Sequence, residues 1–515
     1  MNTKVRRNFS KILLRGISGI LLLAGTLAMF SALWYISIYG DLGFDSILYT
    51  LGGETKGVQP ELVLNYLLTA ALPALLCAGV LGLLLLVPWK FQVVLDLGKR
   101  CVKLFPVNRW VSFGLSVLLA VGLIFHAADR TGLLYYVTAI SKTGSIYEDF
   151  YVSPEDVSVT FPQEKRNLVY IFLESMENTF LPRELGGGVE NNLIPELHQL
   201  AEENVSFSHT DGPGGFFNPT GTTWTAGALI AATSGIHLQL PKGVDNNKYA
   251  QYFEKFLPGA VGITDILHEN GYRQMAMFGS DASFGGRREF FTQHGVDEIF
   301  DLYTARSRGL VANNYFKWWG FEDKKLFEFA KTELTTLAEG EEPFAFYMLT
   351  ADTHFPNGYV CEDCGSDFAQ QYENVIACSS KRVYEFVRWL QAQPFYENTT
   401  IVITGDHATM DNTYISKNVE SDYVRSQYNC FINAAATPVT TQNRASTVFD
   451  MYPTTLAAMG CTVEGDRLGL GTNLFSNYRT VLEIFGSREL LSHHLAQNSV
   501  YYTEIFTTGE EILPQ

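Results

Sequence analysis

Three long apolar runs dominate the first 130 residues of the chain. They cover residues 17–39, 65–89 and 110–128. Each is close to the ~20 residues that an α-helix needs to cross the hydrocarbon core of a bilayer. We therefore expect a membrane anchor of three transmembrane helices in residues 1–130, rather than buried helices of a soluble protein. The first run is long for a cleaved signal peptide and two more follow it, which favours a retained span.

The pattern changes twice after the third run. Residues 131–164 begin with an apolar part too short to span a bilayer, which predicts a membrane-surface helix and a linker. From residue 165 to 515, apolar runs of strand length alternate with amphipathic helical patterns. The expected strands are NLVYIFLES (167–175), YRQMAMFGSD (272–281), FAFYMLTADTH (344–354), TTIVITGDH (399–407) and YNCFINAAA (428–436). The expected helices include residues 194–203 and 379–393. This alternation predicts an α/β domain whose mostly parallel sheet lies between helices.

Acidic residues and histidines stand at the carboxyl ends of four of these strands. They are Glu174, Asp281, Asp352 with His354, and Asp406 with His407. In open α/β sheets, ligands bind beyond the carboxyl ends of the strands, so we expect these side chains at one edge. Asp406 and His407 alone are also compatible with an ordinary loop after a buried strand. Four strands that end in this way favour a binding site instead.

The residue types at this edge indicate a metal site. Carboxylates and imidazoles suit Mn²⁺, Zn²⁺ or Mg²⁺, and no cysteine lies near these positions. A hydroxyl nucleophile could come from Thr220, Thr222, Thr223 or Thr225, which crowd the expected start of a helix near Ala226. The positive end of a helix dipole favours anions and an activated hydroxyl. Simple N-capping by threonine is the alternative, and spacing does not choose among the four.

Charge predicts how the chain sits in the membrane. Lys and Arg concentrate in residues 1–15 and in the loop 90–109, whereas the loop 41–61 is mainly acidic. The positive-inside rule places the two basic segments in the cytoplasm and everything after about residue 130 outside. Residues 1–150 carry a net charge of +5, so residues 151–515 carry −22 of the chain's total of −17. Such an acidic domain argues against nucleic acid as a partner and requires local positive charge for an anionic substrate.

Five of the seven cysteines follow residue 150. They are Cys361, Cys364, Cys378, Cys430 and Cys461. The pair Cys361 and Cys364 has the spacing of half a zinc site, but no second such pair completes it. A disulfide is the favoured interpretation in an oxidising compartment, with the pairing left open.

Seven segments together resemble one enzyme family. They are NLVYIFLES, TTWTAGALIAATSG, FGSDASFGGRREFFTQHG, LTADTHFPNG, VITGDHATM, FDMYPTTLAAMG and RLGLGTNLFS. In this order they resemble the sulfatase-like branch of the alkaline phosphatase superfamily over residues 165–476. Within it, they are most similar to membrane-anchored phosphoglycerol transferases, which include lipoteichoic acid synthases and the enzymes that modify periplasmic glucans. The resemblance implies an alkaline phosphatase-like fold for the domain at 165–515.

The resemblance also implies roles for individual residues. Metal ligands are implied at Glu174, Thr222, Asp406 and His407, with Thr222, the first threonine of T-x-W-T, as the nucleophile. His354 is implied near the substrate phosphate or leaving group, and Arg287 and Asp281 near the headgroup. Lipoteichoic acid synthases have a Phe-Trp pair where this chain has Phe284-Gly285. The Cys or Ser motif of sulfatase nucleophiles is absent, which disfavours sulfate ester hydrolysis.

The implied activity is glycerophosphate transfer at the outer face of a bacterial inner membrane. The donor is phosphatidylglycerol, the acceptor an envelope glycan, and the cofactor Mn²⁺, with Mg²⁺ or Zn²⁺ as alternatives. A covalent threonine intermediate carries the glycerophosphate. The closer motif match favours a periplasmic enzyme. Two alternatives remain at this stage: a phosphoethanolamine transferase or phosphodiesterase of the same superfamily, and a membrane-bound pseudoenzyme that only binds glycan or lipid.

Overall fold

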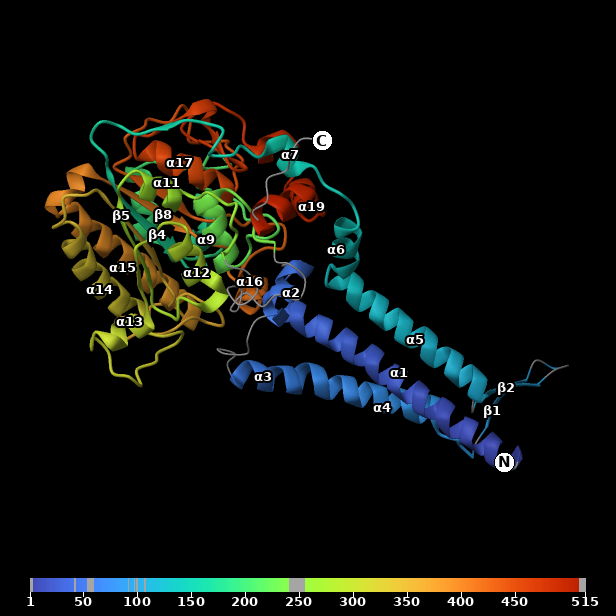
Figure 1. The fold of residues 1–515 in the computed structure, drawn as a ribbon. Helices are drawn as coiled ribbons and strands as arrows, with labels where there is room; N and C mark the ends of the chain where they lie inside the picture. The colour runs from blue at the N-terminus through green and yellow to red at the C-terminus, as the bar shows by residue number, and fades with distance from the viewer. Residues whose placement is uncertain are drawn as a thin grey trace. The chain divides into compact units, whose positions relative to one another are not determined.

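The computed structural model describes residues 3–40, 43–52, 60–90, 92–96, 98, 101–105, 108–239 and 255–508 (Figure 1). The chain divides into two compact units. The smaller comprises Met1–Phe44 and Thr55–Val137, and the larger comprises Asp45–Glu54 and Thr138–Gln515.

The smaller unit is built from long apolar helices. These are α1 (Thr3–Tyr39), α3 (Pro60–Tyr66), α4 (Leu72–Leu86) and α5 (Arg109–Arg130), with a π-helical stretch, Leu67–Ala71, joining α3 to α4. Three segments are long and apolar enough to cross a membrane: Ile12–Tyr39, Leu62–Leu86 and Arg109–Arg130. They agree with the three predicted runs. Strands β1 (Val93–Asp96) and β2 (Cys101–Phe105) form an antiparallel pair between α4 and α5.

Small residues bring α1 and α5 close together. A Cβ atom added to Gly25 of α1 would lie 2.9 Å from the Cα atom of Ala120 on α5. Close backbone approach at small residues is a usual way for helices to pack within a bilayer, where lipid chains are as apolar as leucine. Several charged residues on which the predicted orientation rests, Asp41, Glu54, Lys56, Lys99 and Arg100, lie outside the described residues, so the orientation stays a prediction.

A six-stranded sheet forms the centre of the larger unit. Its strands are β4 (Asn167–Leu173), β5 (Arg273–Phe278), β6 (Glu298–Phe300), β7 (Phe344–Leu349), β8 (Thr399–Gly405) and β9 (Asn429–Ile432). Their spatial order is β6-β5-β7-β4-β8-β9. All neighbours run parallel except β8 and β9, which are antiparallel. The predicted α/β fold with a mostly parallel sheet is confirmed.

Both faces of this sheet are covered by helices (Figure 1). Alternate residues of β4 point to opposite cores: Tyr170 and Phe172 belong to one, Ile171 and Leu173 to the other. The first core includes side chains of α9 (Thr225–Ser234), α11 (Ile263–Glu269), α12 (Arg287–Gln293) and α17 (Met451–Ala458). The second includes those of α8 (Pro195–Glu203), α13 (Leu302–Ser307), α14 (Asp323–Leu337), α15 (Gln371–Gln391) and α16 (Asn412–Asn418). Burial on both sides explains why the strands read as continuous apolar runs.

Shorter elements complete the larger unit. Two of them, α2 (Phe44–Gly52) and α6 (Leu133–Ile140), begin in residues of the smaller unit and end in the larger one. The others are α7 (Ile146–Phe150), β3 (Val159–Thr160), β10 (Thr462–Val463), β11 (Arg467–Leu468), β12 (Gly471–Thr472), α18 (Val481–Phe485) and α19 (Arg488–Leu495). Helix α7 falls in the predicted linker, yet Ile146 and Tyr147 are buried in the first core. Helix α15 begins eight residues before the predicted helix, where Gln370 and Glu373 form a capping box.

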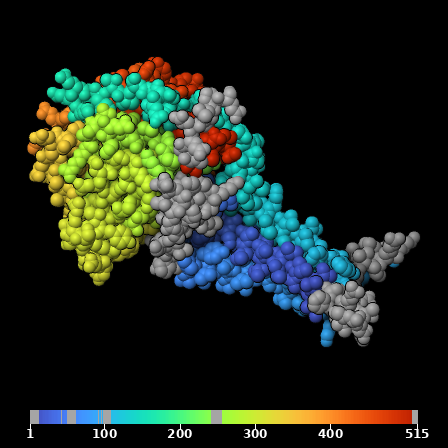
Figure 2. Space-filling view, in the orientation of Figure 1, coloured from blue at the N-terminus to red at the C-terminus, as the bar shows by residue number. Residues whose placement is uncertain are grey.

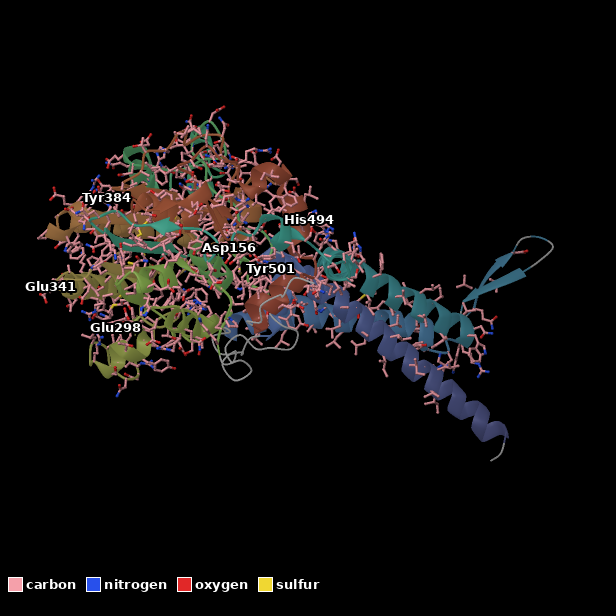
Figure 3. All side chains as sticks on the ribbon, turned by 45° about the horizontal axis from the view of Figure 1, so that its top comes forward. Asp156, Glu298, Glu341, Tyr384, His494 and Tyr501 are labelled. Atoms are coloured by element: carbon pink, nitrogen blue, oxygen red, sulfur yellow. The ribbon has the colours of Figure 1, made fainter. Side chains whose placement is uncertain are left out.

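The surface of the larger unit is polar and acidic. The segment coloured green to yellow, which includes α11 to α14, forms much of its visible face in Figure 2. Acidic side chains such as Glu298 and Glu341 lie at the periphery of this unit, whereas its interior is filled by packed side chains (Figure 3).

Candidate active site and metal centre

Glu174, Asp406 and His407 meet at the carboxyl edge of the sheet. Glu174 follows β4, and Asp406 and His407 follow β8, its parallel neighbour. All three are buried, and one ligand atom from each lies within 4.8 Å of the others. His407 Nε2 is 3.6 Å from Glu174 Oε1 and 3.4 Å from Asp406 Oδ2. The structure thus brings together three of the residues that the sequence placed at one site.

The backbone around the cluster is tightly constrained. A Cβ atom at Gly405 would lie only 1.8 Å from the carbonyl oxygen of Met176, so no larger residue fits there without a shift. Ser175 adopts a left-handed conformation with φ of 56°, which is uncommon outside glycine. In this conformation its amide donates to Asp406 Oδ1 at 2.8 Å and its hydroxyl to Glu174 Oε1 at 2.7 Å. Ser175 therefore orients both carboxylates.

Hydrogen bonds fix the tautomer of His407. Its Nδ1 lies 3.0 Å from the carbonyl oxygen of Ala408 and donates to it, which leaves the Nε2 lone pair directed at the two carboxylates. Burial tends to lower the pKa of His407, but the charges of Asp406 and Glu174 outweigh this and raise it. Burial, with the charge of Glu174, raises the pKa of Asp406 to about 7.

These residues fit a divalent cation. Asp406 Oδ2 is buried and accepts no hydrogen bond from any residue in the described parts of the chain. Two buried carboxylates, one of them with an oxygen that accepts no hydrogen bond, form a costly arrangement beside an imidazole nitrogen unless a positive charge joins them. Oxygen and nitrogen ligands of this kind are those of Mn²⁺, Mg²⁺ and Zn²⁺ sites.

Thr225, rather than Thr222, contacts this cluster. Thr225 is the first residue of α9, and its hydroxyl lies 3.3 Å from Glu174 Oε2 and 3.3 Å from His407 Nε2. Thr222 is fully buried, and its hydroxyl instead donates to the carbonyl oxygen of Pro219 at 2.7 Å. Asn218 donates both to the Thr222 carbonyl oxygen and to that of Asp406, at 2.8 and 2.9 Å. The Thr222 hydroxyl therefore contacts the turn at Pro219, and the Thr225 hydroxyl contacts Glu174 and His407.

His354 lies within electrostatic reach of the cluster and is walled by aromatic rings. Burial lowers its pKa, while the charge of Glu174 acts in the opposite direction. Its Nδ1 is 2.7 Å from the carbonyl oxygen of Phe355, so the neutral ring presents Nε2 as a proton acceptor. The ring of Trp319 packs edge-on against His354, with 4.7 Å between centroids. The ring of Phe284 lies next to that of Trp319, with 5.9 Å between centroids.

Arg287 and Asp281 form a second part of this edge, in the loop after β5. The Arg287 guanidinium donates to the carbonyl oxygens of Phe284 and Asp281 and to the Ser280 hydroxyl, at 2.9, 2.9 and 3.0 Å. Its positive charge contributes to lowering the pKa of His354. The Asp281 carboxylate accepts from the Ser283 amide at 2.9 Å and so caps the turn that carries Arg287. Asp281 is not part of the Glu174, Asp406 and His407 group.

Asp352 has a structural environment, although it follows β7 at the same edge. The Asp323 carboxylate accepts from the amides of Ala351 and Asp352, at 2.7 and 3.1 Å, and Asp352 Oδ1 accepts from the Asp323 amide at 3.2 Å. Burial, together with the charge of Asp323, raises the pKa of Asp352 to about 9. The hydrogen bonds between Asp323 and the Ala351-Asp352 segment hold the loop that carries His354.

Several contributors to the site had little or no signal in the sequence. The Ser175 conformation and the Asn218 bridge depend on tertiary contacts. Thr353 donates to the backbone oxygen of Glu174 at 2.5 Å, and Trp319 approaches His354 from a segment 35 positions away. Thr225 stood among four candidate threonines, and only the direction of its side chain separates it from the others.

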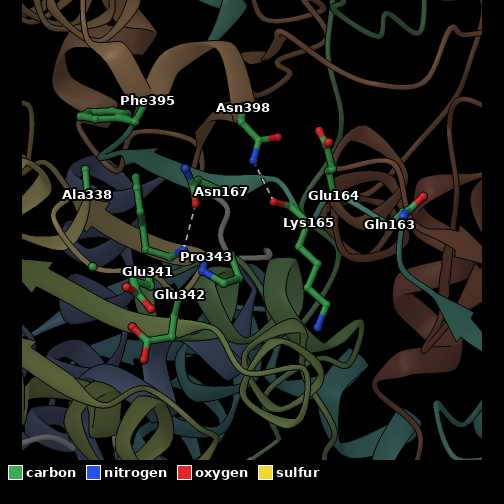
Figure 4. Close-up of a pocket in the computed structure, with 12 residues that line it drawn as sticks. Gln163, Glu164, Lys165, Asn167, Ala338, Glu341, Glu342, Pro343, Phe395 and Asn398 are labelled. Atoms are coloured by element: carbon green, nitrogen blue, oxygen red, sulfur yellow. Dashed lines mark hydrogen bonds between the residues drawn. The ribbon is translucent and has the colours of Figure 1, made fainter.

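A separate pocket lies at the opposite edge of the sheet. It has a volume of about 450 Å³ and is lined by residues at the amino ends of β4 and β7, including Lys165, Asn167, Glu341 and Glu342 (Figure 4). Asn167 Oδ1 accepts from the Phe344 amide at 3.0 Å and joins the two strands there. The pocket lies at the amino ends of these strands, whereas Glu174, Asp406 and His407 lie at the carboxyl edge of the sheet, so the two sites are separate.

The sequence profile of the family described as Sulfatase matches residues 166–461 of this chain. This range contains Glu174, Thr225, Arg287, His354, Asp406 and His407. It also contains all six strands of the central sheet.

Curated relatives carry the name Phosphoglycerol transferase I. The relative from Citrobacter koseri is 29% identical over 412 residues, which cover 78% of this chain and 50% of the relative. The relative from Escherichia fergusonii is 31% identical over 317 residues, 59% of this chain and 39% of the relative. The chain thus spans half or less of the length of these two relatives. A solved structure, lipoteichoic acid synthase LtaP from Listeria monocytogenes, shares 20% identity with a TM-score of 0.46 and covers 62% of this chain and 79% of that one.

Proposed function

Because the chain belongs to the sulfatase family, we propose that it is a membrane-bound phosphotransferase that moves glycerophosphate from phosphatidylglycerol to an envelope glycan. The observation that carries this proposal is the hydroxyl of Thr225 at the buried Glu174, Asp406 and His407 cluster. A nucleophile, a metal ligand set and an adjacent histidine are the parts that a covalent transfer reaction needs. The curated relatives named Phosphoglycerol transferase I support glycerophosphate as the transferred group.

Glu174, Asp406 and His407 would hold the metal, with Thr225 as a further oxygen ligand. When bound, a divalent cation lowers the pKa of a coordinated hydroxyl and neutralises charge on phosphate oxygens. Mn²⁺ is the proposed ion, and Mg²⁺ and Zn²⁺ share the same ligand preferences. Thr225 replaces Thr222 in both the ligand and the nucleophile role, because the Thr222 hydroxyl is committed to Pro219.

Thr225 would attack the phosphorus atom of the donor. After its hydroxyl proton is lost to solvent, its oxygen forms a new bond to phosphorus, the bond to the diacylglycerol oxygen breaks, and glycerophosphate remains on Thr225. The amino end of α9 lies at this point, and its dipole favours the negative charge of the phosphate. An acceptor hydroxyl then displaces Thr225 and leaves with the glycerophosphate, and the Thr225 oxygen takes up a proton from solvent.

His354 and Arg287 would serve the same reaction from the other side of the site. His354, when protonated at Nε2, donates this proton to the leaving diacylglycerol oxygen, and the neutral ring then takes a proton from the acceptor hydroxyl. Arg287 supplies the positive charge that an anionic headgroup needs in an otherwise acidic domain. Asp281 supports Arg287 by capping its turn, at 2.9 Å from the Ser283 amide. Trp319 and Phe284 provide an apolar wall beside the headgroup.

The donor test compares two lipids. Purified full-length protein with Mn²⁺ is supplied with phosphatidylglycerol or phosphatidylethanolamine in mixed micelles, and diacylglycerol release is measured. We expect release from phosphatidylglycerol only, with glycerophosphate passed to an added glucan. Release from phosphatidylethanolamine instead would move the assignment to phosphoethanolamine transfer, and free glycerophosphate with no acceptor product would indicate a phosphodiesterase. No release from either lipid by protein with bound metal would indicate a pseudoenzyme.

A further inference from the structure

Three cysteines of the larger unit form a cluster apart from the metal site. Cys361 and Cys364 belong to the loop 350–370 between β7 and α15, and Cys378 lies on α15. Cys361 Sγ is 3.5 Å from Cys364 Sγ and 3.7 Å from Cys378 Sγ. We refer to these residues as the three-thiol cluster. Cys361 is its central member, because it contacts both others.

A half-buried arginine, Arg382, faces this cluster. Arg382 stands one turn after Cys378 on α15, and its guanidinium donates to Cys361 Sγ at 3.1 Å and approaches Cys378 Sγ at 3.8 Å. Asp363 holds the same guanidinium at 3.2 Å. A cation beside a thiol stabilises the thiolate, which is the nucleophilic form. Hydrogen bonds from Cys364 and then Cys378, together with Arg382, lower the pKa of Cys361, while that of Cys364 is raised.

We propose that the three-thiol cluster is a thiol–disulfide exchange site, in which Cys361 pairs with either Cys378 or Cys364. Three thiols in contact cannot all be paired within the cluster, so one always remains to attack the disulfide of the other two. The cluster offers three sulfur ligands, one short of the four of a closed structural zinc site.

The chemistry needs only a small-molecule disulfide, such as oxidised glutathione. The Cys361 thiolate attacks one sulfur of this disulfide, forming a mixed disulfide and releasing one glutathione thiolate. The Cys378 sulfur, after losing its proton, attacks Cys361 Sγ and releases the second glutathione. Two protein thiols are oxidised and one glutathione disulfide is reduced. Attack by the Cys364 thiolate on Cys361 then forms the alternative pair, and Cys378 leaves and takes up a proton.

The two pairings differ in what they join. A Cys361–Cys378 bond ties the loop 350–370 to α15, whereas a Cys361–Cys364 bond closes a short turn within the loop. This loop carries His354, and the amide of Tyr359, two residues before Cys361, donates to the Asp352 carbonyl oxygen at 2.7 Å. Gln371 of α15 also donates to the carbonyl oxygens of Asn357 and Gly358, at 3.2 and 3.1 Å. The site therefore controls how firmly the His354 loop is held, independently of the proposed transfer reaction.

The test maps disulfides in the full-length protein. The protein is equilibrated in mixtures of reduced and oxidised glutathione, thiols are blocked with an alkylating reagent, and peptides are identified by mass spectrometry. We expect Cys361 to be paired in oxidising mixtures, with Cys378 or with Cys364. Cys378→Ser should give only the Cys361–Cys364 pair, and Cys364→Ser only the Cys361–Cys378 pair. Cys430→Ser is the matched control, because Cys430 is a buried thiol near Leu200, outside the cluster, and its loss should change nothing.

Two further measurements keep the proposal independent of how the serine variants fold. Hydrogen exchange of wild-type residues 353–364 should become faster when the protein is reduced. Alkylation of Cys361 should slow in Arg382→Leu and recover in Arg382→Lys, which keeps the charge. Three alkylated thiols in every glutathione mixture would overturn the proposal. One bound zinc ion per chain, lost only on alkylation of these cysteines, would make the cluster a metal site instead.

Discussion

At the scale of single residues, the direction of two threonine hydroxyls separates a nucleophile from a supporting residue. Thr225→Val should lower diacylglycerol release from phosphatidylglycerol by about 10³-fold or more, since loss of a nucleophile removes the covalent route. Thr222→Val loses only the hydrogen bond to Pro219 and should retain activity within about tenfold. The measurement compares the initial rates of diacylglycerol release by the two variants at equal metal content. The reverse order of effects would restore Thr222 as the nucleophile.

The metal ligands give a second prediction at this scale. Asp406→Asn removes a buried negative charge from the cluster and should weaken Mn²⁺ binding by at least ~100-fold. Asp281→Asn is the matched control, because Asp281 caps the Arg287 turn away from the cluster. Titration calorimetry of both variants with Mn²⁺ measures the difference. Equal affinities would place the metal elsewhere.

A buried histidine outside the site predicts a pH dependence of stability. His237 Nδ1 lies 2.6 Å from the Tyr147 hydroxyl, and burial lowers the pKa of His237 to about 3. In the unfolded chain this pKa is about 6.5, so between these values the unfolded state binds a proton that the folded state does not. The free energy of unfolding should therefore fall as the pH drops from 7 towards 3, by ~5 kcal/mol in total from this residue.

His237→Gln should remove this contribution. Thermal unfolding of the wild type and the variant between pH 4 and 7 measures it. The wild type should lose stability more steeply with acid than the variant does. Parallel curves would show that His237 is not held neutral by the fold.

At the scale of elements, the ends of β4 and β8 carry the site. Gly405→Ala would force a Cβ atom to 1.8 Å from the Met176 carbonyl oxygen, so β8 must shift and move Asp406 and His407. We expect a loss of about 1–3 kcal/mol in the free energy of unfolding and weaker Mn²⁺ binding. Gly212→Ala is the control, since nothing lies within 4 Å of an added Cβ there. Unchanged metal binding in Gly405→Ala would contradict the need for this close approach.

The strands and their catalytic ends could be predicted from the sequence because both depend on local patterns. The apolar runs at 167–173 and 399–405 are continuous since both faces are buried, and the parallel arrangement then places Glu174 and Asp406 at one edge. Which threonine faces them could not be predicted. Thr222 and Thr225 are three residues apart, and the turn at Pro219 and the start of α9 decide where each hydroxyl points.

Long-range packing accounts for the other differences. Trp319 reaches His354 only because the segment after α13 folds over the β7 loop, and no sequence spacing links the two. Asp352 looks like a ligand at a strand end, but its carboxyl group accepts from the amide of Asp323, at the start of α14, and has a structural role. Helix α7 looks like part of a linker, but Tyr147 enters the core of the larger unit.

At the scale of the whole molecule, three helical segments that are long and apolar enough to cross a membrane precede an acidic α/β unit in the chain. The charge of the loops predicts that this unit lies outside the cytoplasm. A membrane-impermeant protease added to spheroplasts should therefore digest the chain after residue 138, whereas in inside-out vesicles the larger unit should be protected. Immunoblotting with an antibody against the C-terminal part reads out the result. The opposite protection pattern would place the unit in the cytoplasm, away from the proposed glycan acceptor.

In the proposed reaction, Thr225 carries the glycerophosphate between donor and acceptor. The most direct measurement incubates the full-length protein with Mn²⁺ and phosphatidylglycerol labelled in the headgroup glycerol, without acceptor, and maps the label by peptide mass spectrometry. The account predicts glycerophosphate on Thr225, present in Thr222→Val, absent in Thr225→Val, and removed when a glucan acceptor is added. Diacylglycerol release with no adduct on Thr225, or an adduct on another residue, would contradict it.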